Sequence, residues 1–183
     1  MEEGATLEFS RLLRVDTIGS EEENRELQPK GDEAAALAVR LGLQKLSDFK
    51  ASVSVFRSMT GEIVTRGRVV ADVVQTCVMS LEPVPGHVEE DFEVRFTTFP
   101  APEPRDLVIG PDDDEPPEPL TGESLDIGEL ATQQLALALD PWPRLPDAEL
   151  PDDLKPDPAR DGPFAALAGL REKQAHGGTG QDG

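Results

Sequence analysis

The residue types best able to do nucleophilic or metal chemistry lie in one stretch, QTCVMSLEPVPGH at 75–87. It holds Cys77, the only cysteine, and His87, one of two histidines. A cysteine nucleophile needs a base within hydrogen-bond reach, and zinc needs four ligands, usually Cys or His. Neither set is available, because the other histidine, His176, lies near the C-terminus. We therefore interpret Cys77 as a small buried hydrophobic residue and His87 as an exposed turn residue.

Carboxylates are abundant, but their pattern does not indicate a catalytic or metal site. The run DDDE lacks the spaced oxygen ligands and central glycine of a calcium loop; its members are Asp112, Asp113, Asp114 and Glu115. The glycines form no phosphate-binding loop. The sequence therefore predicts a non-enzymatic protein with no catalytic residues, no metal, no cofactor and no small-molecule substrate.

The charge distribution indicates what kind of partner the chain binds. The formal net charge is -20, which repels phosphate backbones at long range. Between residues 34 and 81, however, basic residues outnumber acidic ones. Arg66 and Arg68 share one face of a predicted strand, so with Lys50 or Arg57 nearby they could contact a phosphate or an acidic groove. The alternative is that they pair with the chain's own carboxylates.

Targeting and membrane signals are not recognisable in the sequence. The N-terminus MEEGATLEFSRLL lacks the basic region and apolar run of a secretory signal, and no window approaches the length of an apolar membrane span. We expect a soluble cytoplasmic protein without a membrane partner.

Three segments have helical character. DEAAALAVRLGL starts at Asp32, a suitable N-cap, and Gly42 is suited to ending the helix. SLDIGELATQQLALALDP, at 124–141, contains Asp126 and Glu129 at the spacing of a reciprocal cap. PFAALAGLREK at 163–173 predicts a third, short helix.

The strand signals lie mainly between residues 49 and 99. Residues 88–99 alternate apolar and charged side chains with the period of a half-buried strand, and 7–15 predicts a short additional strand. Turn signals at 58–61 and 82–87 join 49–57, 61–81 and 88–99 into a three-stranded antiparallel meander. We expect Val55 opposite Ile63, Gly67 at a bulge or bend, and Cys77 on the core face of the second strand, packed against Phe92 or Val94.

The predicted fold class is α+β. An antiparallel sheet of about three to five strands is backed by two or three short helices within a single domain at 1–172. A proline-rich acidic excursion at 100–120 interrupts this domain, and a flexible tail follows at 173–183.

Several segments, taken in order, resemble the YceD family of large ribosomal RNA subunit accumulation proteins. They are FSRLLRV, GRVVADVVQTCVMSLEPV, EEDFEVRF, SLDIGELATQQLALALDPWPR and PFAALAGL. Many family members carry Cys-x-x-Cys in the long strand and a second cysteine pair after the last helix. Here the first pair reads Cys77, Val78, Met79 and Ser80, and no cysteine follows Pro141, so a metal role of relatives does not carry over.

The resemblance implies a factor that supports 23S rRNA synthesis, processing or accumulation and assembly of the large subunit. The charge favours a ribosomal protein or pre-50S particle as partner, with 112–115 as a candidate contact for a basic partner. One alternative is a direct rRNA-binding module that uses the basic hairpin surface around Lys50, Arg57, Arg66 and Arg68. An RNA-processing hydrolase would instead require clustered carboxylates that hold magnesium.

Overall fold

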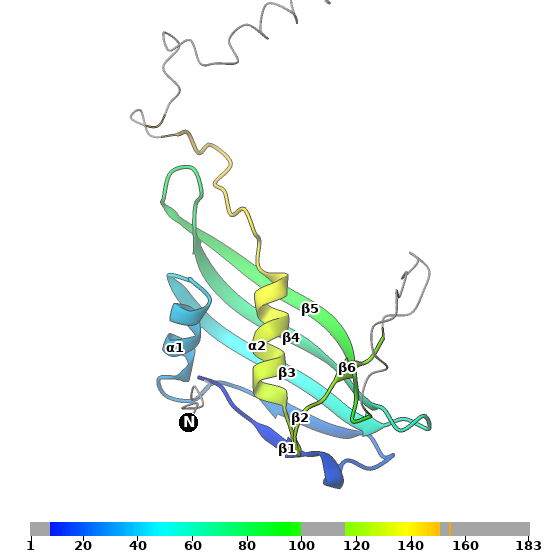
Figure 1. Cartoon of the computed structure of the whole chain (residues 1–183). Coiled ribbons are helices and arrows are strands. Elements are labelled where there is room, and N and C mark those ends of the chain that lie inside the picture. The colour runs from blue at the N-terminus through cyan, green and yellow to red at the C-terminus, as the bar shows by residue number, and fades with distance from the viewer. Residues whose placement is uncertain (1–7, 100–115, 151–153, 155–183) are drawn as a thin grey trace, which may run out of the picture.

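The fold is built on one curved sheet. The computed structural model describes residues 8–99, 116–150 and 154. Five strands follow the order β2-β3-β4-β5-β6, antiparallel except for the β5–β6 pair (Figure 1). Their bounds are Glu23–Leu27, Lys45–Arg57, Ile63–Thr76, Pro83–Thr97 and Glu118–Pro119. The predicted α+β class and the central antiparallel meander, formed by β3, β4 and β5, are confirmed.

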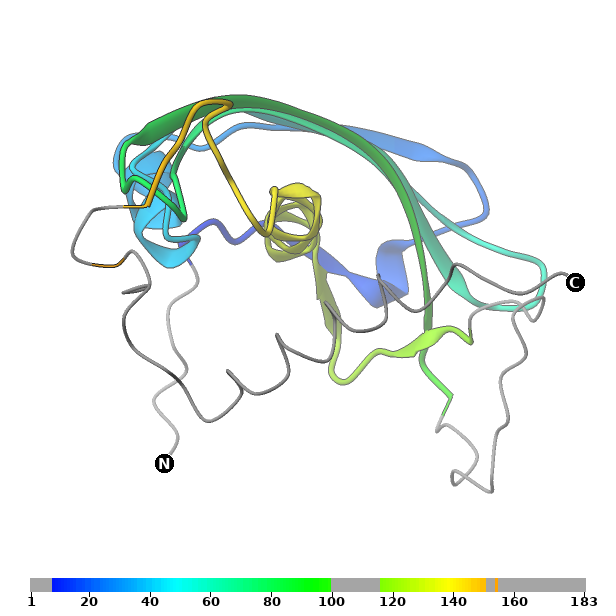
Figure 2. The same ribbon diagram turned by 90° about the horizontal axis from the view of Figure 1, so that it is seen from above.

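Two helices cover the inner face of the sheet, which arches over α2 (Ile127–Ala138) while α1 (Glu33–Arg40) lies toward one end (Figure 2). Alternate residues of β4 point to this inner face and are buried, among them Ile63, Val69 and Val73. Leu130 and Leu135 of α2 belong to the same core. The period-two pattern in the sequence therefore marks the face that packs on α2.

The start of α2 is fixed by a carboxylate that serves two segments. Asp126 accepts hydrogen bonds from the backbone N–H groups of Gly128 and Glu129, as predicted for an N-cap, and also from the Arg11 N–H at 2.7 Å. Asp126 is also the last residue of β7 (Ser124–Asp126), which pairs with β1 (Leu12–Arg14). The short 3-10 helix η1 (Val15–Thr17) follows β1. The Glu129 side chain binds Arg40 instead of completing the predicted reciprocal cap.

The predicted interruption at Gly67 is wrong. Strand β4 runs through this position, and the register shift in the β3–β4 ladder lies near Ser47 instead. Gly67 lies opposite Phe92, and a Cβ atom there would be 2.7 Å from the Phe92 ring and 2.4 Å from the Ser52 carbonyl oxygen. The glycine permits close approach of a neighbouring ring and backbone, not a bend.

The predicted register of the first hairpin is also wrong, by two residues. Val55 pairs with Thr65, and Ile63 pairs with Arg57. The ladder continues closer to the turn than we expected, up to Ser58, whose N–H donates to the Glu62 carbonyl. Because the shift is an even number of residues, each side chain stays on its predicted face.

The second hairpin turns earlier than predicted. Strand β4 ends at Thr76, and the turn is closed by a hydrogen bond from the Cys77 N–H to the Glu82 carbonyl. The predicted turn at 82–87 instead begins β5, so His87 is an exposed strand residue and not a turn residue. Its Nδ1 lies 2.6 Å from the Asp72 carboxylate on β4.

Several predictions lie outside the described residues. These are the third helix at 163–173, the tail at 173–183 and the greater part of the acidic excursion, including 112–115. The end of that excursion is described and contributes β6 to the sheet. The domain boundary at residue 172 stays a prediction.

Candidate interaction surface

The outer face of the sheet, opposite α2, carries the predicted arginine pair. The register places Arg66 opposite Glu93 and Arg68 opposite Asp91. Arg66 Nε lies 2.7 Å from Glu93, and its guanidinium also stacks over the Phe56 ring at 5.3 Å. Arg68 binds Asp91 through two nitrogen atoms, each 2.6 Å from a carboxylate oxygen. Each predicted phosphate-binding arginine therefore already has an acidic cross-strand partner.

These ion pairs reinforce the charged state of both partners. The hydrogen bond with Asp91 raises the pKa of Arg68, which Glu89 also contacts at 2.6 Å. The same hydrogen bond lowers the pKa of the Asp91 carboxyl group. Near neutral pH the arrangement is a row of charges that compensate one another along β4 and β5, not a concentrated positive field.

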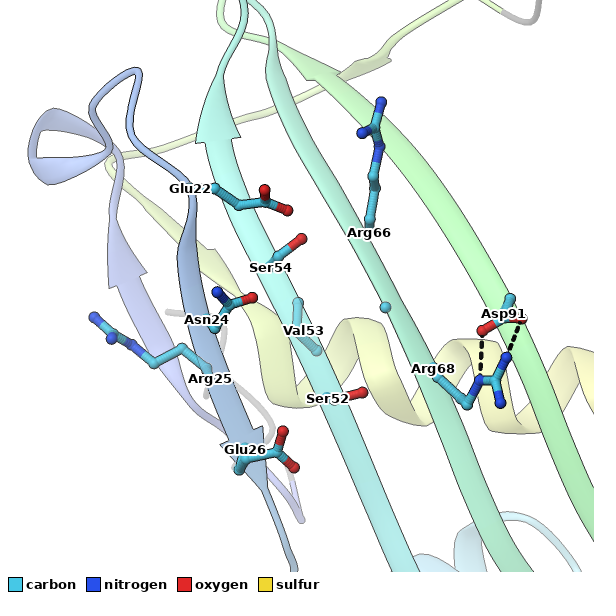
Figure 3. A pocket seen from close by; sticks show the side chains of 11 residues that line it. Glu22, Asn24, Arg25, Glu26, Ser52, Val53, Ser54, Arg66, Arg68 and Asp91 are labelled. Atoms are coloured by element: carbon cyan, nitrogen blue, oxygen red, sulfur yellow. Dashed lines mark hydrogen bonds and ion pairs between the residues drawn. The ribbon is translucent and has the colours of Figure 1, made fainter.

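Beside the arginines the outer face is hollowed by small residues. Ser52, Ser54 and Gly67 line a depression with a volume of about 380 Å³. Glu22, Asn24, Arg25 and Glu26 border one side, and Arg66, Arg68 and Asp91 border the other (Figure 3). Both sides therefore combine acidic and basic groups, and neither presents a purely positive surface to an anion.

The other predicted basic residues are not brought into this arrangement. Arg57 pairs with Ile63, so it belongs with the inner-face residues of β3 and not with the outer-face residues. Its guanidinium donates to the carbonyl oxygens of Val15, Ile18 and Gly61. It joins the turn to the N-terminal segment. Lys50 is an exposed residue beside a separate hollow that Asp48 and Phe49 also line.

Cys77 is buried, as predicted, but it lies in the hairpin turn and not in a strand. The predicted packing against Phe92 or Val94 is wrong, because these residues lie opposite Gly67 and Thr65 while Cys77 lies beyond the end of β4. The Ser80 N–H donates to the Cys77 sulfur at 3.4 Å within the turn. Burial raises the pKa of the thiol, but hydrogen bonds from Ser80, Leu145 and Met79 outweigh it and lower the pKa to about 7. Within 8–99, 116–150 and 154, no group of three His, Cys, Asp or Glu side chains is arranged to hold a metal ion.

The family comparison agrees with the resemblance in the sequence. A family model described as large ribosomal RNA subunit accumulation protein YceD matches residues 65–171, more than half of the 183-residue chain. The chain belongs to the YceD family. No curated protein and no solved structure matches the chain. The YceD match begins inside β4 and includes β5 and α2, and thus both strands that form the charged rows.

The YceD description concerns accumulation of large-subunit rRNA and names no catalytic activity. Neither helix in the described part of the chain is long and apolar enough to cross a membrane. The alternation in 88–99 predicted a charged face for this strand, and Glu89, Asp91 and Glu93 lie on the exposed outer face of β5. The pattern did not identify these carboxylates as the partners of Arg66 and Arg68, because that pairing depends on the register between β4 and β5.

Proposed function

We propose that this YceD-family protein supports large-subunit rRNA accumulation as a non-enzymatic assembly factor in the cytoplasm. It binds a basic ribosomal protein, alone or within a pre-50S particle. The observation that carries this proposal is the state of Arg66 and Arg68: both guanidinium groups bind carboxylates of β5. The face that would contact RNA directly is therefore electrically compensated.

Electrostatics favours a protein partner over bare RNA. At a net charge of -20 the chain is repelled by polyphosphate and attracted to basic proteins, and the association is expected to weaken as salt screens the charges. For Arg66 or Arg68 to bind a phosphate, it would first have to leave a carboxylate 2.6–2.7 Å away. This competition supports the protein-partner proposal over the direct rRNA-binding alternative. The acidic run at 112–115 remains a proposed second contact for the same partner.

Co-sedimentation of the tagged full-length chain with large-subunit precursors tests the proposal. We expect the chain to travel with precursor particles at low salt and to dissociate as salt rises. A mobility-shift assay with protein-free large-subunit rRNA at low salt should show no complex. Failure to sediment with precursors and with free large-subunit proteins, or tight binding to the naked rRNA, would contradict the proposal.

A further inference from the structure

The outer edge of β5 has little pairing with the part of the chain that the structure describes. Among the described residues, only β6 pairs with this edge, at Phe96 and Thr97 near the end of the strand. Figure 1 shows β6 beside that end, while no described strand lies along the remainder of β5. An open strand edge presents unpaired backbone groups that another chain can use as a template.

The hydrogen bonds identify which residues direct their backbone groups outward. Thr65 of β4 donates its hydroxyl to the Val94 carbonyl, so even-numbered residues of β5 face β4. Leu120 donates to the Thr97 carbonyl, so odd-numbered residues face the outer edge. The outward groups between the prolines and β6 therefore include those of His87, Glu89, Asp91 and Glu93.

The first part of the edge is blocked by its own sequence. Pro83 and Pro85 are odd-numbered residues that face the outer edge, and neither has a backbone N–H that could donate to an added strand. This leaves residues 87–93 as the usable part, of a length that suits a short extended peptide.

Side chains along this part define the chemistry of an added strand. Glu89, Asp91 and Glu93 point to the outer face, and Glu90 is exposed on the inner side between the apolar residues Val88 and Phe92. An added strand places its side chains directly beside these. Arg66 and Arg68 already bind three of these four carboxylates, so the row from Glu89 to Glu93 keeps an excess of two negative charges. Basic residues at alternate positions would meet this excess, and apolar residues between them would lie next to Val88 and Phe92.

A second copy of this chain is a poor occupant. Pairing of two β5 edges would bring together two rows that each keep more carboxylates than arginines, and like charges directly opposite are destabilising. At the other edge of the sheet, β2 is shorter, and its residues Asn24 and Glu26 direct their backbone groups away from β3. The acidic β5 edge thus discourages self-pairing and favours a basic partner.

We propose that residues 87–93 of β5 bind an extended basic segment of the partner as an additional strand. Alternating Lys or Arg and apolar residues in that segment would match the side chains described above, and backbone hydrogen bonds would supply affinity. This inference rests on the proposed function, because it names the site and the mode by which a basic ribosomal protein is recognised.

The probe is a capped synthetic peptide of alternating Lys and Val, titrated by fluorescence anisotropy into the full-length chain at low salt. Asp91→Ala removes only the carboxylate, and Asp91→Pro also removes the outward N–H. We expect Asp91→Pro to weaken binding at least about tenfold and Asp91→Ala to weaken it less. Glu26→Ala and Glu26→Pro, the matched changes on the β2 edge, should leave it unchanged.

Thermal unfolding of each variant verifies that the fold is retained, and a peptide with Glu in place of Lys should not bind. Equal losses for Asp91→Ala and Asp91→Pro would overturn strand addition, as would equal losses at Glu26 or no binding by the unaltered chain. A dimer that Asp91→Pro converts to monomer would show that a second copy occupies the edge, which also overturns the inference.

Co-sedimentation separates this inference from the proposed function. If Asp91→Pro sediments with precursor particles as well as the unaltered chain, strand addition is wrong while the proposed function stands. If the unaltered chain does not sediment with them, the proposed function itself fails.

Discussion

The two faces of the sheet use the same strands for different purposes. On the inner face, residues such as Val69 and Ala71 are fully buried against the core beneath the arch. On the outer face, their neighbours Arg66 and Arg68 are half exposed and bound to carboxylates of the next strand. Stability therefore depends on the inner face, and we propose that the outer face and the edge of β5 serve recognition.

Truncating the inner face should have the largest effect. Leu135→Ala removes a fully buried side chain of α2 and is expected to lower the free energy of unfolding by about 2–5 kcal/mol, because it leaves a cavity. Leu137→Ala, on the same helix but 79% exposed, is the matched control and should change it by less than about 0.5 kcal/mol. Chemical denaturation measures both. Similar losses for the two variants would contradict the assignment of the inner face.

A methyl group at Gly67 tests the close approach inside the sheet. Gly67→Ala should lower the free energy of unfolding by about 1–3 kcal/mol, since its Cβ would be 2.4 Å from a backbone oxygen. Gly86→Ala is the control on β5, where the nearest atom would be 3.5 Å away, in ordinary contact. If thermal melts show Gly67→Ala to be as stable as Gly86→Ala, the packing of Phe92 over Gly67 is incorrect.

The Arg40–Glu129 ion pair, which joins α1 to α2, predicts a dependence on pH. The hydrogen bond from Arg40 lowers the pKa of Glu129 below its unfolded value of 4.5. The pair therefore stabilises the fold above that value, and the contribution is lost as the pH falls through the folded pKa. Glu129→Gln should reduce stability by about 1 kcal/mol at pH 7 and by less in acid. A difference that is constant across urea titrations from pH 7 to pH 3 would argue against this ion pair.

The outer face should tolerate substitution best. Arg66→Ala and Arg68→Ala remove exposed ion pairs and are expected to change the free energy of unfolding by less than about 1 kcal/mol. Neither should alter the retention of naked rRNA in a filter-binding assay, because the unaltered chain is not expected to retain it. A loss of rRNA binding in these variants would restore the direct RNA-binding alternative.

What could be predicted from the sequence was the local pattern. The alternation in 88–99 and the odd face of β4 identified the central strands and their buried sides, since side-chain direction follows from the backbone alone. Asp126 identified the start of α2 because capping is also local. The YceD resemblance, carried by whole segments, was confirmed in the part from residue 65 onward.

What could not be predicted depends on distant residues. β2 lies in a polar stretch with Leu27 as its one buried residue. It is a strand because its backbone pairs with the edge of β3, which its own sequence does not indicate. Pro83 and Pro85 indicated a turn, yet an edge strand accepts prolines whose missing N–H would have pointed outward. The ion pairs of Arg66 and Arg68 depend on the β4–β5 register, which short-range patterns did not supply.

Carbodiimide crosslinking of the full-length chain to purified pre-50S particles tests recognition of a basic protein by this acidic chain most directly. The reagent joins carboxylates to lysines, so mass spectrometry identifies both the partner and the contacting residues. We expect crosslinks from Glu89, Glu90, Asp91 or Glu93 to lysines of a basic large-subunit protein. Ultraviolet crosslinks from Arg66 or Arg68 to rRNA, with no carboxylate–lysine links at β5, would contradict the account.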